Sequence, residues 1–159
     1  MARRSAGLLV FRRVPTGIDV LAVHPGGPFW AKKDEGAWSI PKGEIEQSTQ
    51  EEPYLAARRE FQEELGQPPP DGEPIDLGAV RQGGGKIVHV WAIDAGDTTI
   101  ETTAIKSNLV ELEWPRGTGR IRSFPEVDKA EWMSPEEARL KLNKSQTAFV
   151  DRLLYALKD

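Results

Sequence analysis

The stretch REFQEELG, residues 59–66, decides how this chain is organised. On a helix, where successive residues turn by about 100°, Glu60, Glu63 and Glu64 are neighbours three and four positions apart, so their carboxylates share one face. No lysine is interspersed on that face to relieve the repulsion. The opposite face is apolar and can pack on a sheet. Grouped carboxylate oxygens are the ligands that Mg²⁺ or Mn²⁺ prefers, so the stretch predicts a metal-binding helix with an apolar back.

Together with the residues before it, this stretch resembles the signature of the Nudix family. That signature reads Gly, five residues, Glu, seven residues, then Arg-Glu-apolar-x-Glu-Glu-x-Gly-apolar. Glu51, the seven-residue gap and residues 59–66 match it position by position. The chain departs from it twice, because seven residues separate Gly43 from Glu51 and because Gln67 takes the last apolar position. We expect a longer loop before the helix from the first departure and a loss of packing from the second.

The resemblance implies a fold and a reaction. The fold is α/β, a Nudix-type α/β/α sandwich with a mixed β-sheet, in a single domain over residues 1–159. The reaction is the hydrolysis of a nucleoside diphosphate linked to another group, in which water attacks phosphorus with the help of Mg²⁺ or Mn²⁺. A divalent cation suits this chemistry because the phosphates and the carboxylates are all anionic and need positive charge between them.

The resemblance also assigns roles to residues of the helix. The metal ligands that it implies are Glu60, Glu63 and Glu64, with the backbone carbonyl of Gly43. Arg59 and Glu51 are expected to orient these acids, because a guanidinium can meet a carboxylate through two hydrogen bonds. Glu63, Glu64 and Arg59 are therefore the helix residues that we expect to take part in catalysis.

Glu126 is a further acid with an expected role. It stands five residues before Glu131-Trp132-Met133, a spacing similar to that of a loop glutamate in the nucleoside triphosphate pyrophosphohydrolases of the family. That glutamate helps to bind metal or acts as the base. The alternative, an inert acid on a surface loop, stays open.

Substrate phosphates need donors, and a nucleobase needs a flat apolar partner. The expected phosphate donors lie beside Gly43 and in the loop before Glu126, and they are Lys42, Arg116, Arg120 and Arg122. The alternative for each is a charge in solvent. Two aromatic residues in expected loops, Trp30 and Phe124, are predicted to stack on the base.

The substrate class stays open between two groups of the family. The start of the chain, residues 5–13, and Trp38-x-x-Pro41-Lys42-Gly43 resemble both the triphosphate pyrophosphohydrolases and the diadenosine polyphosphate hydrolases. Glu126 favours the triphosphate reading. A third hypothesis is a Nudix-fold module that binds nucleotides without hydrolysing them; such a module would be expected to have lost some of the acids, and none is lost.

Composition limits the other possibilities. A chain of 159 residues with 38% hydrophobic and 29% charged side chains is typical of one globular domain, and a net charge of −4 argues against general binding to nucleic acid. The absence of cysteine excludes disulfides and thiolate metal sites and is compatible with the cytoplasm. No stretch approaches the length of a membrane span, so we expect no membrane partner. Monomer and homodimer are not distinguished.

Local patterns predict the secondary structure. Prolines, glycines and alternating apolar residues favour a hairpin of 6–14 with 18–24, a short strand at 38–40, a helix at about 53–65, a hairpin of 75–82 with 86–95, strands at 109–114 and 129–133, a loop at 115–125, a helix starting at 134 and helical periodicity over 144–157. The glycines at 83–85 suggest a phosphate-binding loop instead, but Lys86 is followed by Ile87 where such a loop needs Ser or Thr.

Overall fold

Alternating apolar residues build the two long strands at the centre of the molecule. The computed structural model describes residues 3–158. In it, β1 (Arg4–Val14) and β2 (Gly17–Pro25) pair antiparallel around the turn that was expected at Pro15-Thr16-Gly17, with Phe11 opposite Val20. Both strands are buried over most of their length. They therefore form the middle of the sheet.

The remaining strands extend this hairpin into a six-stranded mixed sheet. Its order is β4-β5-β1-β2-β8, with the short β3 (Lys42–Glu44) pairing with β1 outside this path. A second hairpin, β4 (Ile75–Gln82) and β5 (Lys86–Asp94), joins through β5, which runs parallel to β1. On the other side, β8 (Val127–Met133) runs antiparallel to β2. One parallel pairing among antiparallel ones makes the sheet mixed, as expected.

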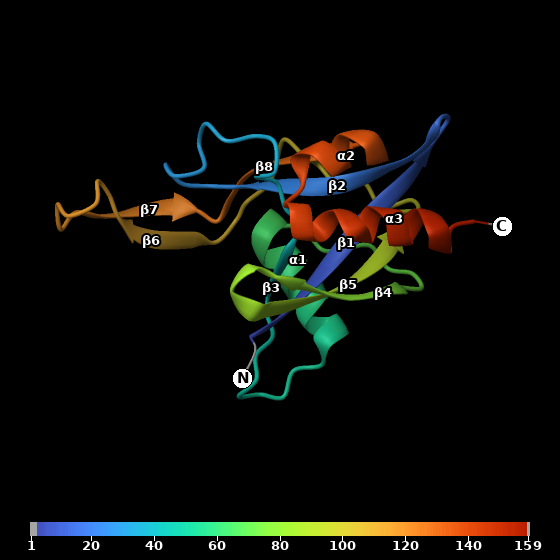
Figure 1. Ribbon diagram of the computed structural model, residues 1–159, viewed down its shortest axis with the longest axis horizontal. Coiled ribbons are helices and arrows are strands. Elements are labelled where there is room, and N and C mark those ends of the chain that lie inside the picture. Colours follow the sequence, from blue (N-terminus) through green and yellow to red (C-terminus); the bar gives the residue numbers. More distant parts are fainter. Residues whose placement is uncertain (1–2, 159) are drawn as a thin grey trace.

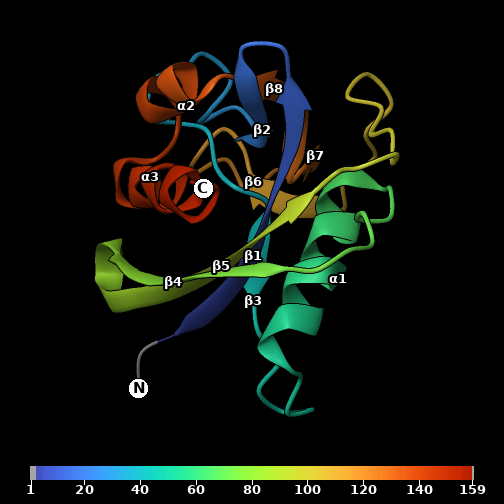
Figure 2. The ribbon, with the colours of Figure 1, turned by 90° about the vertical axis from the view of Figure 1, so that its right-hand side faces the viewer.

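Helices cover both faces of the sheet. Figure 2 shows α1 (Pro53–Leu65) on one side and α2 (Pro135–Lys141) with α3 (Thr147–Ala156) on the other. Two short 3₁₀ turns lie between these elements: η1 (Gly83–Gly85) joins β4 to β5, and η2 (Lys144–Gln146) precedes α3. The expected α/β/α sandwich is confirmed.

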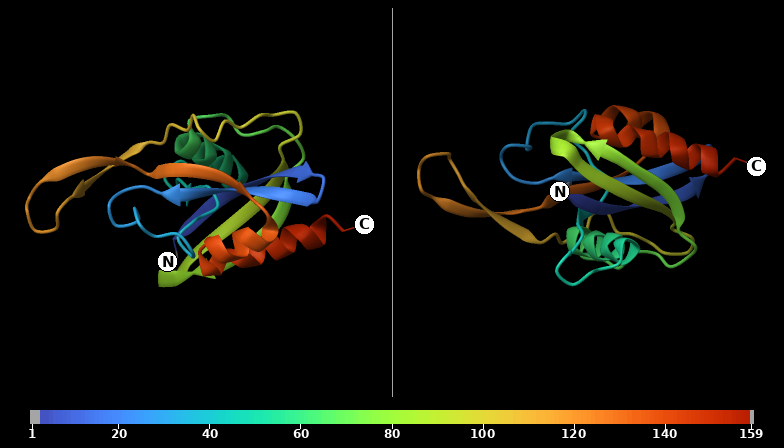
Figure 3. Two further views of the ribbon diagram at one scale, coloured as in Figure 1. Left: turned by 90° about the horizontal axis from the view of Figure 1, so that it is seen from above. Right: turned by 60° about the horizontal axis from the view of Figure 1, so that its bottom comes forward.

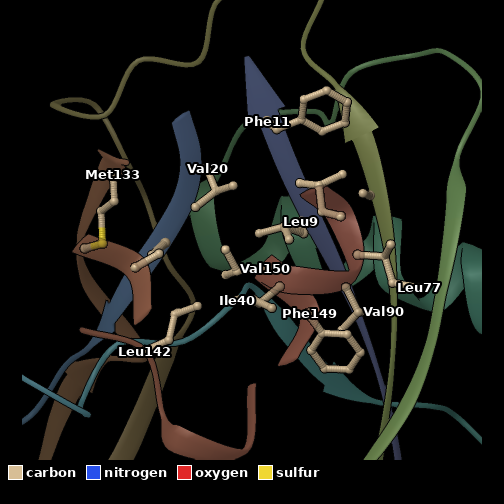
Figure 4. Packing of buried hydrophobic residues seen from close by; sticks show 14 of the residues in the cluster. Leu9, Phe11, Val20, Ile40, Leu77, Val90, Met133, Leu142, Phe149 and Val150 are labelled. Atoms are coloured by element: carbon tan, nitrogen blue, oxygen red, sulfur yellow. The ribbon is translucent and has the colours of Figure 1, made fainter. Parts of the chain in front are cut away.

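Successive side chains of β1 pack into two separate hydrophobic cores, one on each face of the sheet. Leu8 and Val10 point toward α1, where they pack with Phe61 and Leu65 of its apolar face. The residues between them point the other way, into the larger cluster beneath α2 and α3 (Figure 4), which includes Leu9, Phe11, Val90, Phe149 and Val150. Burial of a side chain such as Phe61, which has no exposed surface, contributes roughly 2–3 kcal/mol and holds α1 against the sheet.

The acidic helix has the bounds that the sequence predicts. Pro53 occupies its first turn, where a missing N–H costs nothing. Gly66 ends it in the left-handed region, at φ 71°, and donates its N–H to the carbonyl of Gln62. A residue with a Cβ would be strained at that position, so the glycine fixes where the helix stops.

Two expectations about local structure were wrong. Part of the segment expected as a loop at 115–125 is a strand, β7 (Ile121–Pro125), which pairs antiparallel with β6 (Leu109–Glu113). The strand expected at 38–40 is reduced to two isolated bridges, Val23 with Ser39 and Trp38 with Leu142. Regular pairing begins only at β3, because there the chain meets the edge of β1.

The strands β6 and β7 form a two-stranded ribbon that projects from the body of the molecule (Figures 1 and 3). Its base is fixed by backbone hydrogen bonds: the N–H of Glu126 donates to the carbonyl of Asn108 at 2.8 Å, and the N–H of Gly26 donates to the carbonyl of Glu126 at 2.9 Å. The ribbon thus returns the chain to the sheet at Glu126.

None of the helices formed by residues 3–158 has the length and apolar character needed to span a bilayer.

Candidate active site

The acidic face of α1 lies against β3. Gly43 in this strand approaches Glu60 so closely that a Cβ added to the glycine would lie 2.0 Å from the carboxylate carbon. Any larger residue would therefore push the acid away. The glycine lets the backbone of β3 approach a carboxylate of α1 closely, and the role of its carbonyl as a metal ligand stays a prediction.

Arg59 gathers the acids around one guanidinium group. Its Nε and Nη2 donate to the two carboxylate oxygens of Glu51 at 2.7 and 2.9 Å, a two-pronged contact. Its Nη1 donates to Glu60 at 2.9 Å and to Glu63 at 2.7 Å. The hydrogen bonds to Glu51 are the main reason that the pKa of Arg59 is raised, and they lower the pKa of Glu51. The guanidinium thereby fixes the rotamers of three carboxylates.

Glu64 lies deepest in the site. Its Oε1 accepts a hydrogen bond from the backbone N–H of Lys42 at 3.3 Å. Burial raises the pKa of Glu64 to about 8; the nearby charge of Lys42 opposes this shift, whereas those of Glu126 and Glu60 reinforce it. Burial likewise lowers the pKa of the Lys42 ammonium, with Lys86 adding to the effect. A buried carboxylate among like charges calls for a cation beside it.

Glu126, the residue between β7 and β8, lies near these acids. Burial and the charge of Glu63 raise its pKa. In turn, its own charge contributes to the raised pKa values of Glu60 and Glu64. The structure therefore brings Glu126 within electrostatic reach of all three helix acids.

The donor set suits a divalent cation, although the acids are not a ready-made metal cage. Among residues 3–158, no three acidic, histidine or cysteine side chains are grouped closely enough as they stand to hold a metal ion. The reason is visible in the contacts, because Arg59 Nη1 occupies the space between Glu60 and Glu63. Carboxylate oxygens that are partly desolvated and mutually repelled are the groups that bind Mg²⁺ or Mn²⁺.

A family model matches the part of the chain that carries this geometry. The model described as the NUDIX domain matches residues 1–153. The chain belongs to the Nudix family. The match includes β1, β3, α1 and Glu126, so the elements that carry the acids lie inside the family's domain. Comparison with curated protein sequences returns no match.

Solved Nudix structures share the fold of this domain at low sequence identity. The NUDIX domain of Shewanella oneidensis NrtR, complexed with ADP ribose, superposes with a TM-score of 0.67 at 14% identity, covering 99% of this chain and 90% of that one. The MutT protein from Methanosarcina mazei Go1 gives 0.63 at 18%, covering 99% and 96%. A binary complex of the C. elegans Ap4A hydrolase gives 0.62 at 18%, covering 98% of each chain. At these identities the likeness shows the fold alone.

The other predicted residues of this Nudix domain are not all near its acids. The turn between β6 and β7, which carries Arg116 and Arg120, lies at the far end of the ribbon (Figure 1). Arg122 lies within β7, with its guanidinium carbon 5.7 Å from the centre of the Phe124 ring. The loop of Trp30 approaches Phe124 at Gly27, where an added Cβ would lie 3.9 Å from the Cβ of the phenylalanine. The two aromatic residues thus come from neighbouring segments.

Sequence reasoning missed Lys106 and Asn108. Both belong to the segment that passes the C-terminal end of α1, where the N–H of Lys106 donates to the carbonyl of Leu65 at 2.9 Å and that of Asn108 to the carbonyl of Glu63 at 3.1 Å. No motif marks these residues, because backbone pairing across more than 40 positions leaves no local pattern. Only the folded domain of this Nudix member places them beside the acids.

Proposed function

We propose that this Nudix domain hydrolyses a phosphoanhydride bond in a nucleoside diphosphate derivative, with a divalent cation, and that its substrate is a nucleoside triphosphate from which it releases pyrophosphate. The observation that supports the proposal is the convergence of Glu60, Glu63, Glu64 and Glu126, with Arg59 and Gly43 fixing their positions. A purely solvated acidic helix would have no reason to bury one of its carboxylates.

In this reaction the oxygen of a water molecule forms a bond to phosphorus. The bridging P–O bond breaks, and its electron pair leaves with the departing phosphate. Mg²⁺ or Mn²⁺, when bound, neutralises the charge that develops on the phosphate oxygens. The residues that would hold the ion are Glu60, Glu63 and Glu64, with the carbonyl of Gly43.

The chain's own groups position the reactants and accept the proton. Glu126 is the acid that we assign to take the proton of the attacking water, since its pKa is raised and Arg59 does not bind it. Lys42 lies close enough to Glu64 for its positive charge to act on that carboxylate, and we assign it to bind a substrate phosphate. Arg59 bridges Glu60 and Glu63 through one nitrogen and binds Glu51 through its other two, so it orients all three carboxylates.

A diadenosine polyphosphate is the second candidate substrate. Its support comes from the loop between β2 and β3, where Phe29 is 52% exposed and meets Trp30 edge to face, with ring centroids 5.0 Å apart. The exposed ring of Phe29, in the loop that approaches Phe124 at Gly27, would serve a substrate with two bases, one of which lies outside the catalytic centre. The fold likeness to an Ap4A hydrolase is consistent with this alternative.

One experiment separates these proposals. Purified protein is incubated with Mg²⁺ and a panel of nucleoside triphosphates, diadenosine polyphosphates and nucleoside diphosphate sugars, and the products are resolved by anion-exchange chromatography. Pyrophosphate with a nucleoside monophosphate supports the first proposal, and a mononucleotide with a nucleoside triphosphate supports the second. Binding of nucleotide without any product would contradict both and leave a non-catalytic binding module.

A further inference from the structure

A hollow of about 480 Å³ lies beside Glu63, on the outer side of the C-terminal half of α1. It is lined by Arg59, Gln62, Glu63, Gly66, Lys106 and Asn108. Figure 2 shows the segment that joins β5 to β6 passing this end of the helix. The hollow therefore adjoins Arg59, Glu63 and Gly66 of the Nudix signature, whereas its other lining residues, Gln62, Lys106 and Asn108, are not specified by that signature.

The far wall of the hollow is held firmly in place. Backbone hydrogen bonds tie Lys106 to Leu65 and Asn108 to Glu63, at 2.9 and 3.1 Å. The carbonyl of Asn108 also accepts the N–H of Glu126 at 2.8 Å. At Gly66 the contact is so close that an added Cβ would lie 2.6 Å from the carbonyl oxygen of Lys106. Lys106 and Asn108 thus keep a fixed position relative to two acids of the site.

The side chains of this wall have unused donors. In the part of the chain that the structure describes, the Lys106 ammonium and the side-chain amides of Gln62 and Asn108 form no hydrogen bond or ion pair with the protein. The guanidinium of Arg59, in contrast, is engaged by carboxylates. The one acid of the hollow, Glu63, accepts from that guanidinium at 2.7 Å. Three exposed residues that line the hollow, Gln62, Lys106 and Asn108, therefore keep donors that the protein does not use.

We propose that Lys106 and Asn108 bind the terminal phosphate of a nucleoside polyphosphate, the anionic group that extends past the acids on the Glu63 side. The inference rests on the proposed function and adds the number of phosphates to it. A strongly hydrated ammonium beside an amide donor suits a compact anion. A substrate with three phosphates would fill the hollow, whereas a nucleoside diphosphate sugar would place a neutral sugar there.

Lys106 also has an ordinary structural explanation, because a positive charge near the C-terminal end of α1 stabilises the helix dipole. The two roles differ in what they predict. If Lys106 only stabilises the helix, its removal would change the kinetics with every substrate alike and would lower the melting temperature. If Lys106 binds a phosphate, its removal would raise the KM for a triphosphate and leave the KM for a substrate without the third phosphate unchanged.

The test compares Lys106→Met with Lys144→Met, which removes the same charge from an exposed position on η2, in the opposite layer. Steady-state kinetics are measured with a nucleoside triphosphate and a nucleoside diphosphate sugar. For Lys106→Met we expect a KM for the triphosphate that is raised about tenfold, equivalent to about 1.4 kcal/mol, with kcat nearly unchanged. The KM for the sugar nucleotide and all values for Lys144→Met should change less than about twofold. Equal changes with both substrates, or none with either, would overturn the inference.

A binding assay keeps the inference separate from the proposed function. Calorimetric titration with inorganic tripolyphosphate and Mg²⁺ requires no turnover, and Asn108→Asp provides a second variant that repels an anion without removing a backbone contact. If wild type hydrolyses no nucleotide but binds tripolyphosphate more tightly than both variants, the hollow stands and the hydrolase proposal fails. If wild type hydrolyses the triphosphate and neither variant weakens binding or raises KM, the hollow is refuted and the hydrolase proposal stands. Wild type without turnover and without tripolyphosphate binding overturns both.

Discussion

Replacing Glu64 by Gln is expected to stabilise the metal-free protein at alkaline pH. The pKa of Glu64 rises from an ordinary 4.5 to about 8, mainly because the side chain is buried. The folded state therefore keeps a proton that the unfolded state releases, so this group makes wild type lose stability as the pH rises from about 5 to 8. At about 1.4 kcal/mol per unit, the limit is about 5 kcal/mol. Local relaxation and water entry reduce such penalties, and we expect a gain of roughly 2 kcal/mol for the variant.

The assay is urea unfolding in EDTA at several pH values between 5 and 9. The stability difference between Glu64→Gln and wild type should be small near pH 5, grow up to about pH 8 and stay level above it. Glu52→Gln is the matched control, because Glu52 is exposed at the N-terminus of α1 and its side chain makes no capping hydrogen bond. A variant that is less stable than wild type at pH 9, or a difference that does not depend on pH, would refute the account of Glu64.

Three further substitutions probe the surroundings of the acids. Arg59→Lys should lower turnover at least tenfold and cost about 1–3 kcal/mol of stability, since an ammonium cannot make the two-pronged contact with Glu51. Steady-state kinetics measure the turnover and urea unfolding measures the stability. Wild-type turnover in this variant would count against the role assigned to Arg59. Gly43→Ala should abolish turnover, because the new Cβ would overlap a carboxylate of α1, whereas Gly83→Ala, with open space around it, should leave the rate unchanged. Ser134→Ala removes the oxygen that caps α2 and should cost about 1 kcal/mol of stability with no effect on kcat; a change in kcat would show that this region is coupled to the site.

The fold was predictable where local chemistry determines it. The helix at 53–65 is bounded by a proline and a glycine whose preferences are intrinsic, and the structure confirms both ends. The hairpin of β4 and β5 follows from two alternating segments around three glycines. Each of these signals depends on neighbours in the sequence, so no knowledge of the rest of the fold was needed.

Long-range packing determines what the sequence did not reveal. The parallel pairing of β1 with β5 joins segments more than 80 residues apart and leaves no local trace. The strand β7 was mistaken for a loop because Arg122 and Ser123 interrupt its apolar pattern, because arginines and glycines fill the turn before it, and because it pairs with β6 and buries little. Its exposed position means that burial does not impose an alternating pattern on it.

The candidate site shows the same division. Spacing alone groups Glu60, Glu63 and Glu64, because helix geometry converts intervals of three and four into one face. The proximity of Glu126 was suggested by resemblance, and its position depends on how the ribbon returns the chain to the sheet. Neither spacing nor resemblance could identify Lys106, since its place beside α1 comes from a backbone contact across a long loop.

The most direct test of the account is the binding of Mn²⁺ to the acidic face of α1, measured by calorimetry near neutral pH without nucleotide. We expect wild type and Glu52→Gln to bind the ion alike, and Glu64→Gln to bind it at least about tenfold more weakly, because a neutral amide replaces a charged oxygen ligand. Binding should also weaken as the pH falls below 8, since protons compete for Glu64. Equal affinity in all three proteins would contradict the claim that these glutamates form the metal site.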